Sequence, residues 1–188
     1  MTVITKDHEQ ALLGFARTVL ENHFKQDKSL PQLDDPVFAD FRGTFVTLKI
    51  GDTLRGCIGT IEPVRTIKDG VEANVVSAAF HDTRFAPLSR EELDRVHISI
   101  SILTQAEPLL YDNTAELRTR LRRGMDGVIL RCGRSSATFL PQVWEQLPDA
   151  ELFLSHLSLK AGLSKDGWKD ENIDVLTYQV QSFAEDEE

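Results

Sequence analysis

The chain has few of the features that mark secreted, membrane-spanning or metal-binding proteins. It contains only two cysteines among its 188 residues, Cys57 and Cys132, and their spacing gives neither a zinc-binding pattern nor a disulfide framework. No apolar run approaches the roughly 20 residues that span a bilayer, and MTVITKDHEQ lacks the basic start and apolar stretch of a secretory signal. We therefore expect a cytoplasmic protein with reduced thiols, without a transmembrane segment, a resident metal or a cofactor.

The sequence also lacks the short motifs of common enzyme families. It contains no GxxxxGK[ST], no GxGxxG after a strand, no HExxH, no CxxC and no GxSxG. The five histidines, at positions 8, 23, 81, 97 and 156, are scattered, and none pairs with another at ligand spacing. The net charge is −9, and the last four residues, EDEE, supply −4 of it. This acidic composition disfavours a protein that binds nucleic acid through its phosphates.

One basic cluster stands out against this acidic background, namely the four arginines of ELRTRLRRG: Arg118, Arg120, Arg122 and Arg123. One interpretation is a solvated helix face whose charges are balanced by nearby acids. The other is a patch that binds an anion or a partner. The sequence leaves both open.

Hydrophobic spacing predicts a mixture of helices and strands. We expect helices over 5–26, from Pro63 in a first turn through Ala78, over 114–123 and over 150–162. We expect strands over 44–50, 54–60, 97–104, 128–132, 137–140 and 175–180. Because strands and helices do not alternate regularly, we expect an α+β fold with mixed or antiparallel sheets rather than a doubly wound parallel sheet.

The hexapeptide LRGCIG, residues 54–59, holds the first candidates for chemistry. Side chains of a strand alternate between its faces, so Leu54 and Ile58 are expected to face the core while Arg55 and Cys57 share the other face. Cys57 would then lie beside a guanidinium and ahead of a helix N terminus. Both features favour a thiolate over a thiol.

Gly56 and Gly59 flank this cysteine and leave two interpretations open. Because glycines carry no side chain, a ligand or another chain could approach the backbone closely there. Alternatively, Cys57 is a small hydrophobe packed into tight backbone, as buried cysteines often are. Cys132 lies on the apolar face of its strand and is predicted to pack in the core. A redox pair of the two cysteines stays open, because the sequence does not fix the distance between them.

A second polar patch is AAFHDTRFAPL, at the end of a predicted helix. In one interpretation, Asp82 and Arg84 pair or cap backbone groups while neighbouring phenylalanines, Phe85 among them, anchor the turn. In the other, Asp82 and Arg84 line a cleft near Cys57, together with His81.

Five blocks of the sequence resemble the AMMECR family, the A component of the AmmeMemoRadiSam system. They are GTFVTLKIGDTLRGCIGTIEP, ANVVSAAFHDTRFAPLSREEL, ISISILTQAEPL, TFLPQVWEQLP and SLKAGLSKDGW. LRGCIG is the signature hexapeptide of that family and stands here intact. The resemblance implies one AMMECR-type domain over residues 4–184, an α+β fold with a larger and a smaller lobe, followed by an acidic tail at 185–188.

The resemblance also implies partners and directs attention to a site. Family members tend to be encoded beside a Memo-type protein and a radical SAM protein, which suggests a shared pathway or complex. The residues most worth testing are those of LRGCIG together with Asp82, Arg84 and Phe85. The resemblance does not give a reaction or an oligomeric state.

Two hypotheses for function follow. In the first, the protein is a thiol-dependent enzyme or substrate carrier: Cys57 is the nucleophile, Arg55 stabilises the thiolate or an anionic substrate, and Asp82 orients groups in the cleft. The binding residues would then be Gly56, Gly59, His81, Arg84 and Phe85. In the second, the protein is a non-catalytic module that docks the two partners, and Cys57 serves only for packing.

Overall fold

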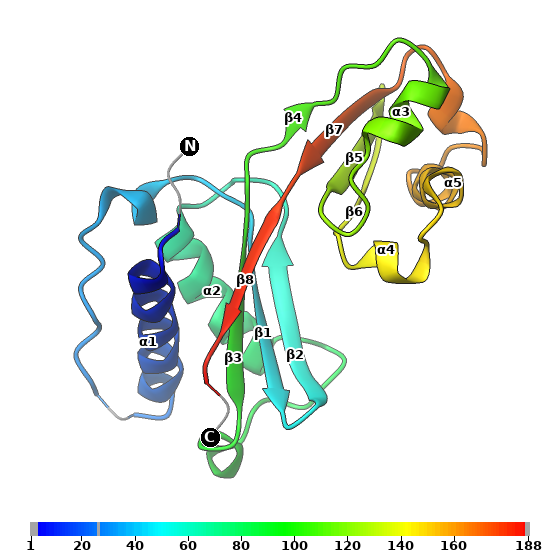
Figure 1. Ribbon diagram of the computed structural model, residues 1–188. Coiled ribbons are helices and arrows are strands. Elements are labelled where there is room, and N and C mark those ends of the chain that lie inside the picture. Colours follow the sequence, from blue (N-terminus) through cyan, green and yellow to red (C-terminus); the bar gives the residue numbers. More distant parts are fainter. Residues whose placement is uncertain (1–3, 26, 187–188) are drawn as a thin grey trace. The chain divides into compact units, whose positions relative to one another are not determined.

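The computed structural model describes residues 4–25 and 27–186 (Figure 1). Within this part the chain divides into a larger and a smaller unit. The first unit is formed by the chain up to Leu103 together with the stretch from Gln181 onward, and the second by Thr104–Val180. The structure contains two four-stranded antiparallel sheets with packed helices. The α+β class expected from the sequence is confirmed.

The first unit combines one sheet with two long helices. Its elements are α1 (Lys6–His23), the 3-10 turn η1 (Pro36–Ala39), β1 (Thr44–Ile50), β2 (Thr53–Thr60), α2 (Ile67–Phe80), η2 (Arg90–Glu92), β3 (His97–Leu103) and β8 (Val180–Ala184). The strand order is β2-β1-β3-β8, so β2 lies at one edge of the sheet.

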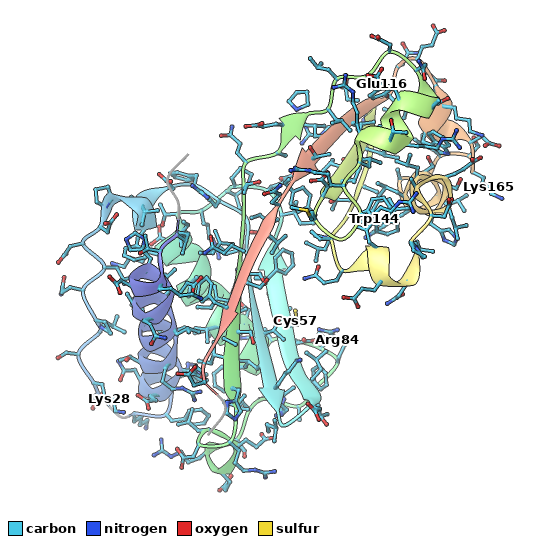
Figure 2. All side chains as sticks on the ribbon, in the orientation of Figure 1. Lys28, Cys57, Arg84, Glu116, Trp144 and Lys165 are labelled. Atoms are coloured by element: carbon cyan, nitrogen blue, oxygen red, sulfur yellow. The ribbon has the colours of Figure 1, made fainter. Side chains whose placement is uncertain are left out.

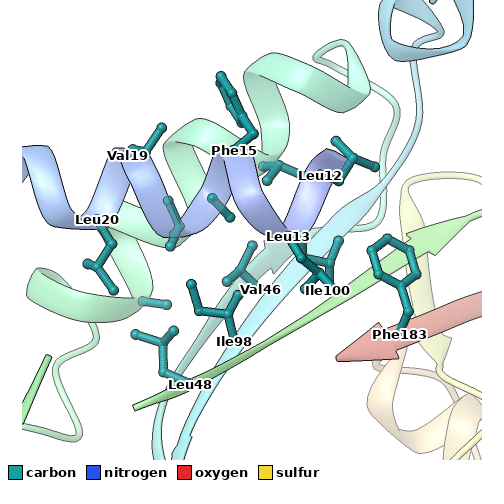
Figure 3. Close-up of a cluster of buried hydrophobic side chains, with 14 of the residues drawn as sticks. Leu12, Leu13, Phe15, Val19, Leu20, Val46, Leu48, Ile98, Ile100 and Phe183 are labelled. Carbon is teal, nitrogen blue, oxygen red and sulfur yellow. The ribbon is translucent and has the colours of Figure 1, made fainter. Parts of the chain in front are cut away.

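Helices α1 and α2 pack against one face of this sheet, and the core fills the space between them (Figure 3). Val46 and Leu48 on β1 are fully buried, and so are Ile98 and Ile100 on β3. Burial of each such side chain contributes about 1.5–3 kcal/mol to folding. Thr47, between two buried neighbours, points to the opposite face of the sheet. The strands predicted over 44–50 and 97–104 are confirmed, and buried side chains alternate along both.

Helix α2 begins later than the sequence suggested. Pro63 was expected in its first turn, but the helix starts at Ile67. Thr66 is the N-cap, and its hydroxyl accepts a hydrogen bond from the Asp69 N–H at 3.1 Å. The Ile67 N–H also donates to the Asp40 carbonyl at 2.9 Å. The side-chain cap therefore decides the start, and Pro63 belongs to the preceding loop.

The second unit has its own sheet and short helices. Its elements are β4 (Glu107–Pro108), α3 (Thr114–Arg120), β5 (Gly127–Cys132), β6 (Ser135–Phe139), α4 (Val143–Gln146), α5 (Ala150–Lys160), η3 (Gly167–Lys169) and β7 (Asp174–Tyr178), and the strand order is β4-β7-β5-β6.

Two buried tryptophans anchor the core of this unit. Trp144 stacks on Phe153 with ring centroids 3.8 Å apart, and its indole N–H donates to the Asp126 carbonyl at 2.8 Å. The indole N–H of Trp168 donates to the Ser155 hydroxyl at 3.3 Å. Each ring therefore buries a large apolar surface while its one polar group is satisfied.

Helix α3 is shorter than predicted, since it ends at Arg120 and not at residue 123. Leu121 leaves the helix in an extended conformation and buries its side chain in the core of the second unit. Gly124 then adopts a φ of +74°, which glycine reaches without the penalty other residues incur. The helix therefore ends before Arg122 and Arg123, because Leu121 leaves the helical path and buries its side chain.

The last predicted strand, over 175–180, consists of two strands in different sheets. β7 ends at Tyr178, and β8 continues as an edge strand of the first sheet. The predicted acidic tail at 185–188 is in part anchored: the Glu185 carboxylate accepts hydrogen bonds from the Arg17 Nε and the Ile98 N–H, both at 2.8 Å. Residues 187 and 188 lie outside the described part of the chain.

Candidate functional site

The register between β1 and β2 shifts inside LRGCIG. Leu48 pairs with Gly56, but Lys49 pairs with Leu54, which leaves Arg55 as an extra residue without a partner in β1. Such a bulge interrupts the strict alternation of side chains.

The bulge separates the two apolar residues of the hexapeptide. Ile58 packs against the core of the first unit as predicted, whereas Leu54, beyond the bulge, is not among the described residues that pack there. The prediction that both face the core is therefore wrong for Leu54.

Arg55 belongs to a tight ion pair with Glu92. Its Nε and Nη2 donate to the two carboxylate oxygens at 2.8 and 2.9 Å, and Nη2 also reaches the Pro87 carbonyl at 3.3 Å. The Arg55 side chain is only 14% exposed. Hydrogen bonding to Arg55 lowers the pKa of Glu92 to about 2. The guanidinium therefore fastens the segment around Pro87 and Glu92 to β2, a task that its position in the sequence did not reveal.

A second ion pair, between Asp82 and Arg84, holds the backbone of Cys57. The Arg84 Nε and Nη2 donate to the Asp82 carboxylate at 2.9 and 2.7 Å. The Cys57 N–H donates to Asp82 at 2.9 Å, and the Cys57 carbonyl accepts from the Arg84 Nη2 at 3.2 Å. The pair therefore occupies both backbone groups of Cys57 on the edge strand, as a neighbouring strand would.

The two partners of this pair differ in exposure. The Asp82 side chain is 4% exposed and that of Arg84 55%. Hydrogen bonds from the Arg84 side chain, followed by that from the Cys57 N–H, hold the pKa of Asp82 well below its usual range. Asp82 is therefore a buried, permanently charged anchor, while much of Arg84 stays open to solvent.

The thiol of Cys57 is half-buried and has polar neighbours. Its Sγ accepts a hydrogen bond from the Thr47 hydroxyl at 3.3 Å, across the β1–β2 ladder. The pKa of Arg84 is raised, chiefly by Asp82 and to a smaller extent by Cys57. Figure 2 shows Cys57 and Arg84 beside β2. The Arg55 guanidinium pairs with Glu92, whereas the described contact of an arginine side chain with Cys57 is made by Arg84.

The helix terminus near LRGCIG is also the opposite of the one expected. A side chain at Gly56 would collide with the Ala78 carbonyl in the last turn of α2. The C-terminal end of the helix therefore lies against this part of β2. Because a helix C terminus favours cations, it gives a thiolate no support, and that part of the prediction is wrong.

Both glycines of the hexapeptide are explained by packing within the protein. Gly56 meets the backbone of α2, and a side chain at Gly59 would collide with the Phe45 ring on β1. The space that the missing side chains leave is filled by the protein's own atoms. Close approach of a ligand is thus not needed to explain either glycine.

Phe85 and His81 complete the predicted set. The Phe85 ring lies 5.5 Å from the Arg84 guanidinium carbon, a cation–π arrangement that supports the guanidinium from one side. His81 ends α2, and its backbone N–H donates to the Ser77 carbonyl at 2.9 Å. The structure therefore places Asp82 and Arg84 on Cys57 and Phe85 on Arg84, whereas among the described residues the His81 ring has no contact with this group.

Two contributors escaped the sequence reasoning. Thr47 was identified only as part of a strand, although pairing of 44–50 with 54–60 already places it opposite Cys57. Glu92 lies 37 residues from Arg55. No local feature of the sequence could have shown that Arg55 and Glu92 form a pair.

The remaining predictions concern Cys132 and the arginines. Cys132 is half-buried and packs against the core of the second unit, as predicted, and both cysteines are free thiols. Three arginines of ELRTRLRRG form ion pairs with carboxylates: Arg118 with Glu151, Arg120 with Glu116 and Arg122 with Asp126. These pairs favour the solvated helix face over an anion-binding patch.

The described residues contain no group of three His, Cys, Asp or Glu side chains that could hold a metal ion. Among these same residues, no helix is long and apolar enough to cross a membrane.

The sequence matches the family AMMECR1 over residues 13–183. The chain belongs to the AMMECR1 family. A protein of Methanothermobacter thermautotrophicus is 39% identical over 186 residues, which cover 97% of each chain. A protein of Methanocaldococcus jannaschii is 35% identical over 188 residues, covering 98% of this AMMECR1 chain and 94% of the relative.

A solved structure shows the same fold. The crystal structure of an uncharacterized protein from Pyrococcus horikoshii matches this AMMECR1 protein with a TM-score of 0.79 at 31% identity, and the match covers 97% of this chain and 94% of the other. These similarities establish family and fold, and the names of the relatives state no activity.

Proposed function

We propose that this AMMECR1 protein is a thiol-dependent enzyme or substrate carrier whose reactive group is Cys57. The observation that carries the proposal is the environment of the sulfur. Cys57 is half-buried, and its Sγ accepts a hydrogen bond from the Thr47 hydroxyl at 3.3 Å. Arg84 also lies beside it, so the thiol has polar neighbours. A purely structural cysteine would instead be enclosed by aliphatic atoms.

Each neighbouring residue has a distinct role in this proposal. Arg84 takes the task first assigned to Arg55: it stabilises the thiolate or an anionic group of the substrate. Asp82 is a positioning residue, because it orients Arg84 and fixes the Cys57 backbone. Arg55 is structural and holds the neighbouring segment through Glu92.

The covalent step is a nucleophilic displacement. The Cys57 thiol first releases its proton to water, and the thiolate then attacks an electrophilic carbon of the substrate. A new S–C bond forms, and the displaced group leaves with the electron pair of its former bond. No oxidant or reductant is consumed.

The proposal includes the AmmeMemoRadiSam setting. We expect Cys57 to act together with a Memo-type protein and a radical SAM protein in the cytoplasm, where thiols are kept reduced. Membership of the AMMECR1 family supports this expectation.

The alternative is a non-catalytic adaptor that docks these two proteins. It is favoured by the packing of Gly56 and Gly59, which explains both glycines of the Gly-Cys-Ile-Gly segment without any chemistry. In that case Arg84, with its exposed guanidinium on the Phe85 ring, would be a contact residue.

Mass spectrometry tests the two functions against each other. The protein is isolated after co-expression with the Memo-type and radical SAM proteins, and its intact mass is compared with that of Cys57→Ser and Cys132→Ser variants. A covalent carrier shows an added mass that is lost in Cys57→Ser and kept in Cys132→Ser. Unmodified protein that co-purifies with either partner, in wild type and Cys57→Ser alike, contradicts the thiol-dependent function and supports the adaptor.

A further inference from the structure

The second unit contains a cavity of about 720 Å³ that the proposed function does not use. Its walls come from four segments: the chain from β4 into α3, the end of β5, the turn η3 with the residues after it, and the start of β7. The volume lies within the roughly 300–1,000 Å³ that is usual for small-molecule sites.

The cavity has an apolar and aromatic lining. Trp168, Ile173 and Val175 line it and are buried in the core of this unit, while Tyr111 is half-buried beside them. Leu110, in contrast, is 77% exposed, the largest exposed fraction among the large apolar side chains described. A bound molecule with an apolar body would cover this leucine and gain the corresponding free energy of burial.

Carboxylates outnumber cations around this lining. Four carboxylates contribute to the wall, those of Asp112, Asp170, Glu171 and Asp174. Within the described chain, none of them has a salt bridge.

The two cations of the wall do not balance these charges. Lys169 is paired with Asp166 at 2.7 Å and with Glu151 at 3.5 Å, both outside the cavity. Arg131 faces Asp174 across the β5–β7 ladder and can offset one carboxylate. The cavity as a whole therefore carries an excess of negative charge.

Two of these carboxylates have described polar neighbours. Asp170 accepts hydrogen bonds from the backbone and side-chain N–H groups of Asn172, which lower its pKa. Asp174 lies close enough to the Tyr111 hydroxyl to raise the pKa of that phenol, after the larger effect of burial. The hydroxyl therefore stays protonated next to a carboxylate and adds a neutral polar group to the wall.

We propose that this cavity binds a small organic cation, an amine or guanidine carried on an apolar or aromatic body. The body lies on Leu110, Tyr111 and the edge of Trp168, and the cationic group lies among the carboxylates of Glu171 and Asp174. An anion of the same shape is rejected, because it would meet the uncompensated carboxylates. The inference stands independently of Cys57, since it rests on residues of the second unit alone.

Three probes of similar shape and different charge test the proposal: phenethylamine, 2-phenylethanol and phenylacetate. The full chain is labelled with ¹⁵N, and each probe is titrated at pH 7 while the two indole N–H signals are followed. Trp168 lines the cavity and Trp144 does not, so the second indole is an internal control. We expect phenethylamine to shift the Trp168 signal in a saturable way, 2-phenylethanol to bind more weakly and phenylacetate to bind least.

Variants then locate the site. The double variant Glu171→Gln, Asp174→Asn is expected to weaken binding of phenethylamine at least about fivefold, since two favourable charges are removed. Glu145→Gln, an exposed residue outside the cavity, is the control and leaves binding unchanged. Leu110→Ser alters an exposed side chain, so it keeps the fold, and it weakens phenethylamine and 2-phenylethanol alike.

Two results overturn the proposal. One is binding of phenylacetate as tight as that of phenethylamine. The other is an affinity for phenethylamine that neither the double variant nor Leu110→Ser changes. Neither result touches the proposed function, because the mass on Cys57 is measured separately.

Discussion

The two halves of the signature sequence LRGCIG differ in how far the protein itself encloses their side chains. In the first half, Arg55 is bound to Glu92 and Gly56 lies against the Ala78 carbonyl, so this half is closed by the protein itself. In the second half, the Cys57 backbone is held by Asp82 and Arg84, while Cys57 is half-buried and the Arg84 side chain is 55% exposed. One half stabilises the fold, and the other holds the thiol that we propose to be reactive.

The largest expected effect comes from adding a side chain at Gly56, in the first half. In Gly56→Ala the new methyl group collides with the Ala78 carbonyl, so β2 and α2 must move apart. We expect a loss of about 3 kcal/mol in the free energy of unfolding, measured by urea denaturation. Gly14→Ala is the matched control, since Gly14 lies within α1 with open space around its Cα, and we expect a gain of about 0.5–1 kcal/mol there. Equal stability of Gly56→Ala and wild type would contradict the packing described.

The next largest effect is expected from breaking the ion pair between Arg55 and Glu92. Glu92→Gln removes the charge from the partner of Arg55, and we expect the free energy of unfolding to fall by about 1–2 kcal/mol at pH 7. Glu62→Gln serves as the control, because the Glu62 residue is exposed and its side chain has no described contact.

The pH dependence of stability sharpens the test of this pair. Hydrogen bonds from Arg55 and, to a smaller extent, from Ser89 lower the pKa of Glu92 from 4.5 to about 2, so the folded state favours the ionised form. The stability that the pair provides is therefore complete above about pH 4.5 and is lost as the pH falls toward 2. The difference in the free energy of unfolding between wild type and Glu92→Gln should therefore shrink as the pH falls from about 4.5 toward 2. A constant difference between the two proteins down to pH 2 would show that the charge is irrelevant.

In the open half, the effect is measured as the reactivity of the thiol. We expect Arg84→Gln to slow alkylation of Cys57 by iodoacetamide several-fold, because the cation that favours the thiolate is removed. Arg95→Gln, at an exposed arginine, is the control for the loss of one positive charge. An Arg84→Gln protein that is alkylated as fast as wild type would assign the arginine to structure alone.

The smallest effect belongs to Thr47. Thr47→Val removes the hydroxyl that donates to the Cys57 sulfur and keeps the shape of the side chain. We expect a change in the alkylation rate of about twofold, with Thr47→Ser restoring the wild-type rate. If valine and serine behave alike, the hydroxyl has no part in the reactivity of the thiol.

The sequence predicted those features that depend on local periodicity. Alternation identified β3, and the residue types with the following turn identified β1; their buried residues Val46, Leu48, Ile98 and Ile100 form one face of the core. It failed at Leu54, because a bulge has no signal in a single strand and arises only from the pairing of two. It also missed β8, whose only buried residue is Phe183.

The candidate site was only partly accessible to such reasoning. Asp82 and Arg84 were identified, since a short turn holds both and the family resemblance pointed to them. The partner of Arg55 was not, because Glu92 reaches it through the fold and not through the sequence. The cation beside the thiol was consequently predicted to be Arg55, which is near Cys57 in the sequence, and not Arg84, which lies 27 residues after Cys57.

The central claim, that Cys57 is an accessible and activated thiol, is tested most directly by competitive alkylation of the two cysteines. The folded protein is treated with limiting iodoacetamide at pH 7, and the modified peptides are quantified by mass spectrometry. We predict that Cys57 is alkylated about tenfold faster than Cys132, which packs against the core of the second unit. Equal rates, or modification of Cys57 only after unfolding, would contradict the account.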